Sequence, residues 1–253
     1  MPYGIRNTLS VMTATLWTLK FLIHRQKGDS APNFQEFTLE IDPNEYVLDA
    51  VERVWAFDDR SLTFRHACHH SVCGACGMRV NGVEKLSCIT RLRDITTNGS
   101  VVKIEPLRNF PVISDLVVDM GSLYARMETV GAKQILTLAQ APLTEDVYPS
   151  KNGGEFSRLS DCIECGLCIS ACPVAATDPD YLGPAPLAAA QQNGLAENPK
   201  TVLQLVDSEE GVWRCHSAYE CTAVCPSNVQ PAWRIMDLRK KVVGQRIKSF
   251  FGK

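Results

Sequence analysis

The residues with the clearest chemistry in this sequence are its 11 cysteines, which fall into three groups. Cysteine thiolates bind zinc and iron–sulfur clusters, whereas disulfides need paired partners and an oxidising compartment. An odd number leaves at least one cysteine over in a disulfide framework, and most of these cysteines lie only a few residues from the next. We therefore interpret them as ligands of metal centres.

The first group is Cys68, Cys73, Cys76 and Cys88, with the spacing of plant-type [2Fe–2S] ferredoxins. Gly74 and Gly77 allow the loop backbone to approach a small cluster closely. A zinc site is less well supported, because zinc ligands usually come as two C-x2-C pairs. A Rieske centre would need two histidines in place of two cysteines. His69 and His70 are therefore predicted to be surface residues of the loop.

The second and third groups form an imperfect repeat, CIECGLCISACP and CHSAYECTAVCP. The first copy has the bacterial two-cluster pattern C-x2-C-x2-C-x3-C-P, in which the fourth cysteine binds the other cluster. Cross-ligation between the copies predicts two ligand sets. One set, which suffices for [4Fe–4S], is Cys162, Cys165, Cys168 and Cys225; the other is Cys172, Cys215 and Cys221.

Ala218 stands where the repeat would place a fourth cysteine of the last set. A cluster with three thiolates lacks a protein ligand for one iron, so we predict a [3Fe–4S] centre there. The alternative is a [4Fe–4S] cluster with water or another side chain on the open iron; the neighbouring His216 is expected to point away. Sets of four, four and three ligands use all 11 cysteines.

The composition limits the other classes of function. A net charge of −2 gives no basic stripe of the kind that binds nucleic acid. No apolar run reaches the roughly 18 residues of a membrane-spanning helix. The apolar segment 11–23 is not predicted to be a signal peptide, because Lys20 interrupts it and the alternation that follows is typical of a strand.

Two kinds of elements must position the cysteines. In the first half, alternating apolar residues predict strands, and Asn81-Gly82 predicts a hairpin. The predicted strands cover residues 16–25, 34–41, 78–80, 83–87 and 101–104, with one helix over residues 48–57. After about residue 112 the pattern becomes helical, with helices predicted over residues 114–140, 186–193, 201–211 and 231–250.

These patterns predict an α+β fold in two domains. Residues 1–15 form an N-terminal extension, and the first 11 of them have no assigned role. Residues 16–112 form a [2Fe–2S] ferredoxin domain. Residues 113–253 form a helical, bacterial-type ferredoxin domain for the [4Fe–4S] and [3Fe–4S] clusters.

From about residue 16 to its C-terminal end, the sequence resembles the iron–sulfur subunits of succinate dehydrogenase and fumarate reductase. The resemblance rests on the segments ACHHSVCGACGM, NFPVISDLVVDM, CIECGLCISACP, YLGPAPLAAA and GVWRCHSAYECTAVCP. It implies a β-grasp ferredoxin domain followed by an α-helical one. It also implies that the three sets of cysteines hold [2Fe–2S], [4Fe–4S] and [3Fe–4S] clusters.

The resemblance further implies an electron-transfer subunit without substrate chemistry of its own. In this family, electrons from succinate pass from a flavoprotein subunit with covalent FAD through the three clusters to a quinone. Such complexes serve the tricarboxylic acid cycle and respiratory chain. The sequence has no G-x-G-x-x-G motif for FAD and no membrane span, so the flavin and the membrane anchor, which can carry haem, would belong to partner subunits. The implied location is the cytoplasmic face of a bacterial membrane.

Pro173 and His216 are expected near the quinone from their positions in the family pattern. For His216, packing against the cluster loop is an equal alternative. Residues 174–177 lack the Trp that is typical of ubiquinone-linked members, which favours menaquinone. Succinate oxidation is the favoured direction, and fumarate reduction is the alternative.

Two further alternatives stay open. A freestanding multi-cluster ferredoxin is a different class of function, although the slight net charge offers little for a charged docking face. The segment 239–253 carries six basic residues and no acidic one. It is interpreted either as an amphipathic helix at a membrane surface or as a terminal helix packed on its own domain.

Overall fold

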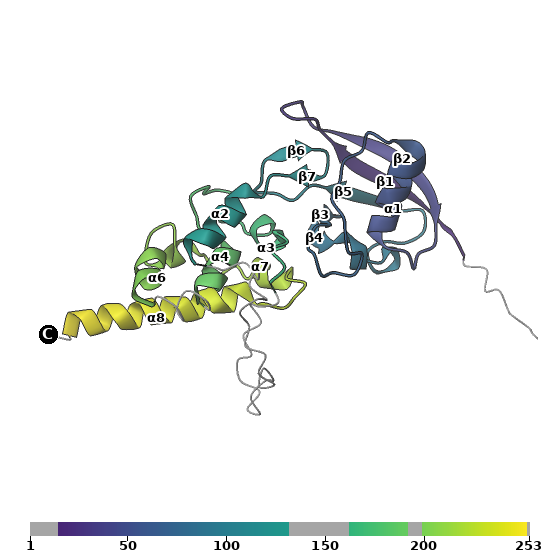
Figure 1. The fold of residues 1–253 in the computed structure, drawn as a ribbon. Coiled ribbons are helices and arrows are strands. Elements are labelled where there is room, and N and C mark those ends of the chain that lie inside the picture. Colours follow the sequence, from purple (N-terminus) through teal and green to yellow (C-terminus); the bar gives the residue numbers. More distant parts are fainter. Residues whose placement is uncertain (1–14, 132–161, 192–198, 252–253) are drawn as a thin grey trace, which may run out of the picture.

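The structure is a computed structural model that describes residues 15–131, 162–191 and 199–251. A sheet domain and a helical domain lie side by side, and the long last helix runs along the helical one (Figure 1). The predicted N-terminal extension, apart from residue 15, and the predicted helical residues 132–140, 192 and 193 lie outside the described residues.

The sheet domain has the mixed five-stranded sheet of a β-grasp fold, with the strand order β2-β1-β5-β3-β4. β1 and β5 are parallel, whereas the other neighbours in the sheet are antiparallel. The strands are β1 (Trp17–Arg25), β2 (Asn33–Ile41), β3 (Gly77–Val80), β4 (Val83–Leu86) and β5 (Val101–Glu105). All five predicted strands are confirmed.

The alternation of the sequence explains how the sheet buries one face. Leu19, Phe21 and Ile23 of β1 are completely buried, as every second residue of a half-buried strand should be. They share a core with α1 (Val47–Arg53), whose Val51 is also fully buried. One irregular turn, Val54–Asp58, extends this helix to the end of its predicted range.

The predicted helix over residues 114–140 is wrong at its start. The chain forms a hairpin of β6 (Val112–Ser114) and β7 (Val117–Val118), and α2 begins only at Gly121 and covers Gly121–Thr129. Asp115 forms the turn with a φ of 47° and is completely buried. The apolar residues of this segment therefore face a core from a hairpin, although their spacing resembles that of a helix.

The helical domain forms around short helices and one long helix. The other predicted helices are confirmed with shifted ends. They are α4 (Pro184–Ala189), α6 (Pro199–Val206) and α8 (Pro231–Phe251), and the cysteine segments add α3 (Leu167–Ser170) and α7 (Glu220–Ala223). Of these, α4 packs against α8, and its Leu187, Ala188 and Ala189 are completely buried.

The two halves of α8 differ in their surroundings. Ile235, Leu238 and Val242 are buried against the domain, whereas Phe250 and Phe251 are about four-fifths exposed. The first half is therefore a packed helix, and the last turns carry apolar side chains at the surface. Among the described helices, none has the length and apolar character needed to span a bilayer.

The two domains share apolar and polar contacts. One core cluster includes Leu86 and Phe110 together with Leu167 and Ile169 of the helical domain. The buried carboxylate of Glu84 on β4 accepts a hydrogen bond of 2.9 Å from the Ser170 hydroxyl at the end of α3. These contacts fix the cysteine segment of α3 against the sheet domain.

Candidate metal centres

The first group of cysteines lies on the loop before β3 and on the turn after β4. Cys76 and Cys88 are each 3% exposed, whereas Cys73 is exposed. The hairpin brings Cys76 and Cys88 together, because both the backbone N–H and the hydroxyl of Ser87 donate to the carbonyl oxygen of Cys76. His69 and His70 are exposed on the loop, as predicted.

The loop is curled so that its N–H groups point at a sulfur atom. The backbone N–H groups of His70, Val72 and Cys73 donate to the Cys68 Sγ over 3.3–3.5 Å. The hydrogen bonds from His70 and Cys73 are the main cause that lowers the pKa of Cys68 to about 6. The loop is therefore built to hold a thiolate at this position, as an iron–sulfur ligand requires.

Four cysteines from both copies of the repeat line a second cavity, namely Cys162, Cys165, Cys168 and Cys225. Gly166 begins α3 with a φ of 77°, a conformation that suits glycine and turns the chain around the cavity. Burial raises the pKa of Cys165 to about 12 and that of Cys168 well above its ordinary value. The Val229 N–H donates to the Cys225 Sγ over 3.3 Å.

The remaining cysteines, Cys172, Cys215 and Cys221, line a third cavity. Ala218 lines it as well and presents only a methyl group, which cannot bind a metal. Burial raises the pKa of Cys221 to about 12, and the Ser217 N–H donates to the Cys215 Sγ over 3.4 Å. The cavities thus divide the seven cysteines of the helical domain into the same four and three as cross-ligation does.

The two residues expected near the quinone, Pro173 and His216, both line the third cavity and are exposed. They lie on the segments that carry Cys172 and Cys215, so the backbone places them at the mouth of this cavity. The sequence predicts that His216 points away from the third cluster. In the structure it is one of the residues that line the third cavity, so it lies at the edge of that site.

The donor sets fit iron–sulfur clusters on their own chemistry. The second and third sets combine thiols on largely apolar walls with an N–H donor aimed at sulfur, and the loop of the first set aims N–H groups at the Cys68 sulfur. Buried thiols with raised pKa values, such as Cys165, are stable in protonated form until a metal displaces the proton.

Family models for iron–sulfur domains match both halves of the chain. The family model for a 2Fe-2S iron-sulfur cluster binding domain matches residues 20–125, and that for a 4Fe-4S dicluster domain matches residues 158–229. The fumarate reductase iron-sulfur subunit of Mycobacterium tuberculosis is 39% identical over 89% of this chain and 92% of that protein. The chain belongs to the family of iron–sulfur subunits of fumarate reductase and succinate dehydrogenase.

A succinate dehydrogenase subunit and a solved structure are also similar to this chain. The succinate dehydrogenase iron-sulfur subunit of Coxiella burnetii is 30% identical over 89% of this chain and 97% of that protein. A solved structure of the Mycobacterium smegmatis Sdh1 complex contains a chain of the same fold, with a TM-score of 0.69 and 24% identity. That match covers 92% of this chain and 98% of the other. This iron–sulfur subunit is thus a subunit of an oxidoreductase, with a [2Fe–2S] domain and a dicluster domain in the predicted order.

Sequence reasoning missed two residues that shape these sites. The Asn109 amide donates to three carbonyl oxygens at the end of α3, those of Ile169, Ser170 and Cys172. Tyr181 lines the third cavity and is 1% exposed; burial and then the nearby Cys215 raise its pKa. Asn109 belongs to the connector NFPVISDLVVDM, so its place in a distinctive motif was a signal, but its partners lie 60 residues away.

Proposed function

We propose that this subunit relays electrons between a flavoprotein subunit and a quinone, through a [2Fe–2S], a [4Fe–4S] and a [3Fe–4S] cluster in that order. The observation that carries the proposal is the contact between the first two sites. A Cβ added at Gly74, in the loop of the first group, would lie 2.8 Å from the Cβ of Cys165 in the second. The loop of the first site therefore touches the segment of the second, and electron transfer is fast only between centres that lie near each other.

The second and third sites are also next to each other, because one segment of the chain contributes cysteines to both. The segment 162–172 contributes Cys162, Cys165 and Cys168 to the second cavity and Cys172 to the third. The single helical turn of α3 separates these two sites, and Asn109 fixes the end of that turn. A rigid backbone between the sites would keep the spacing of the centres constant.

We assign the ligands of the second and third clusters as the cavities group them, and those of the first cluster from the spacing of its cysteines. The [2Fe–2S] ligands are Cys68, Cys73, Cys76 and Cys88; the [4Fe–4S] ligands are Cys162, Cys165, Cys168 and Cys225; the [3Fe–4S] ligands are Cys172, Cys215 and Cys221. When bound, the clusters supply one-electron redox chemistry. The chain itself buries four of these cysteines, namely Cys76, Cys88, Cys172 and Cys221, and offers N–H groups that stabilise thiolate charge.

The quinone end of the relay is proposed at the mouth of the third cavity. Pro173 and His216 are exposed there, beside Cys172 and Cys215. A ring nitrogen of His216 can donate to or accept from a quinone oxygen. The absence of Trp from residues 174–177 supports menaquinone as the quinone.

The proposed partners supply the FAD and the membrane anchor, for which this sequence has no motif and no apolar span. The FAD would belong to a flavoprotein subunit that contacts the first loop, where Cys73 is exposed. One or more membrane anchor subunits would hold the quinone end at the cytoplasmic face of a bacterial membrane. The exposed apolar residues at the end of α8, among them Ile247, Phe250 and Phe251, support an attachment of this kind.

Succinate oxidation is the direction we favour, with fumarate reduction as the second candidate. The relative from Mycobacterium tuberculosis that is named a fumarate reductase subunit, at 39% identity, supports the second candidate. The rates of the assembled complex in both directions, with menaquinone and menaquinol, would distinguish them.

The test is reduction of the clusters by succinate. The chain with its three clusters, purified alone under anaerobic conditions, should not be reduced by succinate. After addition of its flavoprotein partner, succinate should reduce the clusters, as followed by electron paramagnetic resonance and bleaching of visible absorption. Succinate oxidation by the chain alone, or a flavoprotein that never associates with it, would overturn the proposal and favour a freestanding ferredoxin.

A further inference from the structure

Three side chains that no cluster uses converge beside the first loop. Glu52 comes from α1, and His66 and His69 come from the segment around Cys68. The Glu52 Oε1 lies 3.2 Å from the His66 Nδ1 and 3.4 Å from the His69 Nε2, and the two nitrogens share a hydrogen bond of 3.1 Å that a bound cation would replace. The three atoms form a nearly equilateral triangle.

The size of this triangle matches one face of a metal coordination tetrahedron. Zinc binds histidine nitrogen and carboxylate oxygen at roughly 2.0–2.2 Å, so ligands at tetrahedral corners lie roughly 3.3–3.5 Å from one another. The observed separations are 3.1–3.4 Å. A cation could therefore contact all three atoms after only small movements of the side chains.

If no metal ion were bound, the buried carboxylate oxygen of Glu52 would need a hydrogen bond, and the described residues give it none. The Glu52 Oε1 is buried, and within the described parts of the chain it has no hydrogen-bond partner. Both ring nitrogens are near enough, yet neither points an N–H at this oxygen with hydrogen-bond geometry. A buried acceptor without a donor is costly, and a cation in the triangle would satisfy it.

The surrounding residues hold the two rings in place. Phe64 stacks on His66, with 5.1 Å between ring centroids and an angle of 20°. The His66 and His69 rings are perpendicular, with centroids 5.2 Å apart. His69 adopts a φ of 60° in the curled loop, which turns its side chain toward Glu52. The rings are thus positioned before any cation binds.

We propose that Glu52, His66 and His69 form a fourth metal site, for a divalent transition-metal ion of the zinc type. Two imidazoles and one carboxylate suit zinc rather than magnesium, which prefers oxygen ligands and keeps its waters. The three side chains are about one-third to one-half exposed, so water fills the fourth position. The bound ion joins α1 to the loop of the [2Fe–2S] cysteines without using a cluster ligand.

The test is zinc binding to the full chain with its three clusters assembled. Zinc ions alone should bind at one site per chain in isothermal titration, and millimolar magnesium should not compete. Zinc K-edge X-ray absorption should show nitrogen and oxygen ligands at about 2.0–2.1 Å and no sulfur at about 2.3 Å. Sulfur ligands would mean that zinc had displaced cluster iron, and they would overturn the proposal, as would the absence of binding.

Substitutions should separate this site from the rest of the loop. Glu52→Gln, His66→Gln and His69→Gln should each weaken zinc binding at least about tenfold, since losses of this size follow even from outer-shell changes. His70→Gln is the matched control, because His70 is an exposed histidine of the same loop outside the triangle. Equal loss in His70→Gln would contradict the proposal.

The [2Fe–2S] signal of each variant reports whether the loop is still folded. If a histidine variant lost the cluster, the zinc affinity of Glu52→Gln would decide the test, because Glu52 lies on α1 and outside the loop. Unchanged zinc affinity in Glu52→Gln would then overturn the assignment. Neither outcome depends on succinate or quinone, so this test is separate from that of the electron relay.

Discussion

At the scale of single residues, the surroundings of the cysteines shift their pKa values in opposite directions. Cys68 accepts N–H hydrogen bonds, which lower its pKa to about 6, whereas burial raises the pKa of Cys88 to about 12. The N–H groups therefore favour the thiolate form of Cys68, whereas burial favours the thiol form of Cys88 until iron binds. Cluster assembly must therefore release protons from the buried cysteines, which couples assembly to pH.

Ala218 is the residue that decides the third cluster. Ala218→Cys should convert the [3Fe–4S] centre into [4Fe–4S], because a fourth thiolate would reach the cavity that Cys172, Cys215 and Cys221 line. The oxidised protein should lose the [3Fe–4S] paramagnetic signal, its iron content should rise by one atom per chain, and the potential of the centre should fall.

A second variant controls for the added thiol. Ala176→Cys adds an exposed thiol in the same region but outside the lining of the third cavity. Its [3Fe–4S] signal should match that of the wild type. A wild-type protein without that signal would contradict the count of three ligands.

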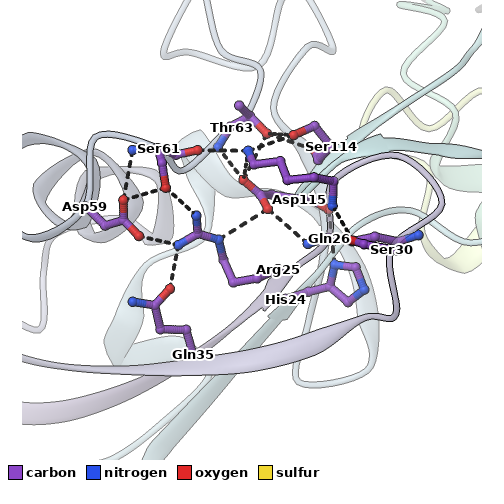
Figure 2. Close-up of polar contacts among 11 residues, drawn as sticks. His24, Arg25, Gln26, Ser30, Gln35, Asp59, Ser61, Thr63, Ser114 and Asp115 are labelled. Atoms are coloured by element: carbon purple, nitrogen blue, oxygen red, sulfur yellow. Dashed lines mark hydrogen bonds and ion pairs between the residues drawn. The ribbon is translucent and has the colours of Figure 1, made fainter.

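At the scale of elements, Asp115 ties the β6–β7 hairpin to β1. Its carboxylate, only 1% exposed, accepts hydrogen bonds from the side chains of Arg25 and Lys27 and from the backbone N–H groups of Gln26 and Thr63 (Figure 2). Asp59 holds the other side of the Arg25 guanidinium at 2.6 Å. This network explains why residues after Ser114 leave the helical pattern and turn back.

Asp115→Ala should lower the free energy of unfolding by about 3 kcal/mol, because Arg25, whose side chain is only 11% exposed, loses this partner. We place the effect at the lower end of the range for buried pairs, since Lys27 is half-exposed and its ion pair is screened by solvent. The measurement is the urea midpoint of the anaerobic holoprotein by circular dichroism. Asp94→Ala, which removes an exposed carboxylate, should change it by less than about 0.5 kcal/mol.

The contribution of Asp115 should depend on pH with a defined sign. Burial raises its pKa, but the hydrogen bonds from Lys27, Thr63 and Gln26 outweigh burial, so the folded pKa lies below the ordinary value. The stability is therefore present above the unfolded pKa of about 3.9 and is lost as the pH falls through the folded pKa. The difference between wild type and Asp115→Ala should narrow below about pH 4; a constant difference would contradict this account.

At the scale of the whole molecule, the contact between the two domains sets the distance between the first two sites. Gly74 has a φ of 70°, and a Cβ there would lie 2.7 Å from the Ile163 carbonyl oxygen and 2.8 Å from the Cys165 Cβ. Neither neighbour is the end of a flexible side chain. The loop can approach the second site this closely only because residue 74 has no side chain.

Gly74→Ala should push the first loop away from the segment of Cys165. In the assembled complex, succinate–quinone activity should fall severalfold, while electron paramagnetic resonance still detects all three clusters. Gly99→Ala is the matched control, because Gly99 also has a positive φ, of 78°, but no atom lies within 4 Å of its added Cβ. It should cost about 1 kcal/mol of stability and leave the activity unchanged. Equal losses of activity in both variants would show that backbone strain is the cause.

The sequence predicted the strands, the main helices and the family, because these depend on local patterns. The alternation of apolar residues along residues 17–25 predicts a strand, and Asn81-Gly82 predicts a turn. Both depend on backbone geometry within only a few residues. The hairpin of residues 112–118 was missed, because its turn depends on Asp115 reaching Arg25 and Thr63 far away in the chain. The local propensity of a segment does not depend on such distant partners, so it could not predict this hairpin.

The sequence by itself determined which cysteines are available and how they are spaced, since a cluster loop must supply several thiolates from one short stretch of chain. The repeat also predicted which of its cysteines share a cavity, and the cavities have the same division. Only the tertiary structure decided that Gly74 brings the first site against the second. It also placed Glu52 beside His66 and His69. The reason is physical: a ligand set that spans separate elements exists only after hydrophobic burial has packed those elements together.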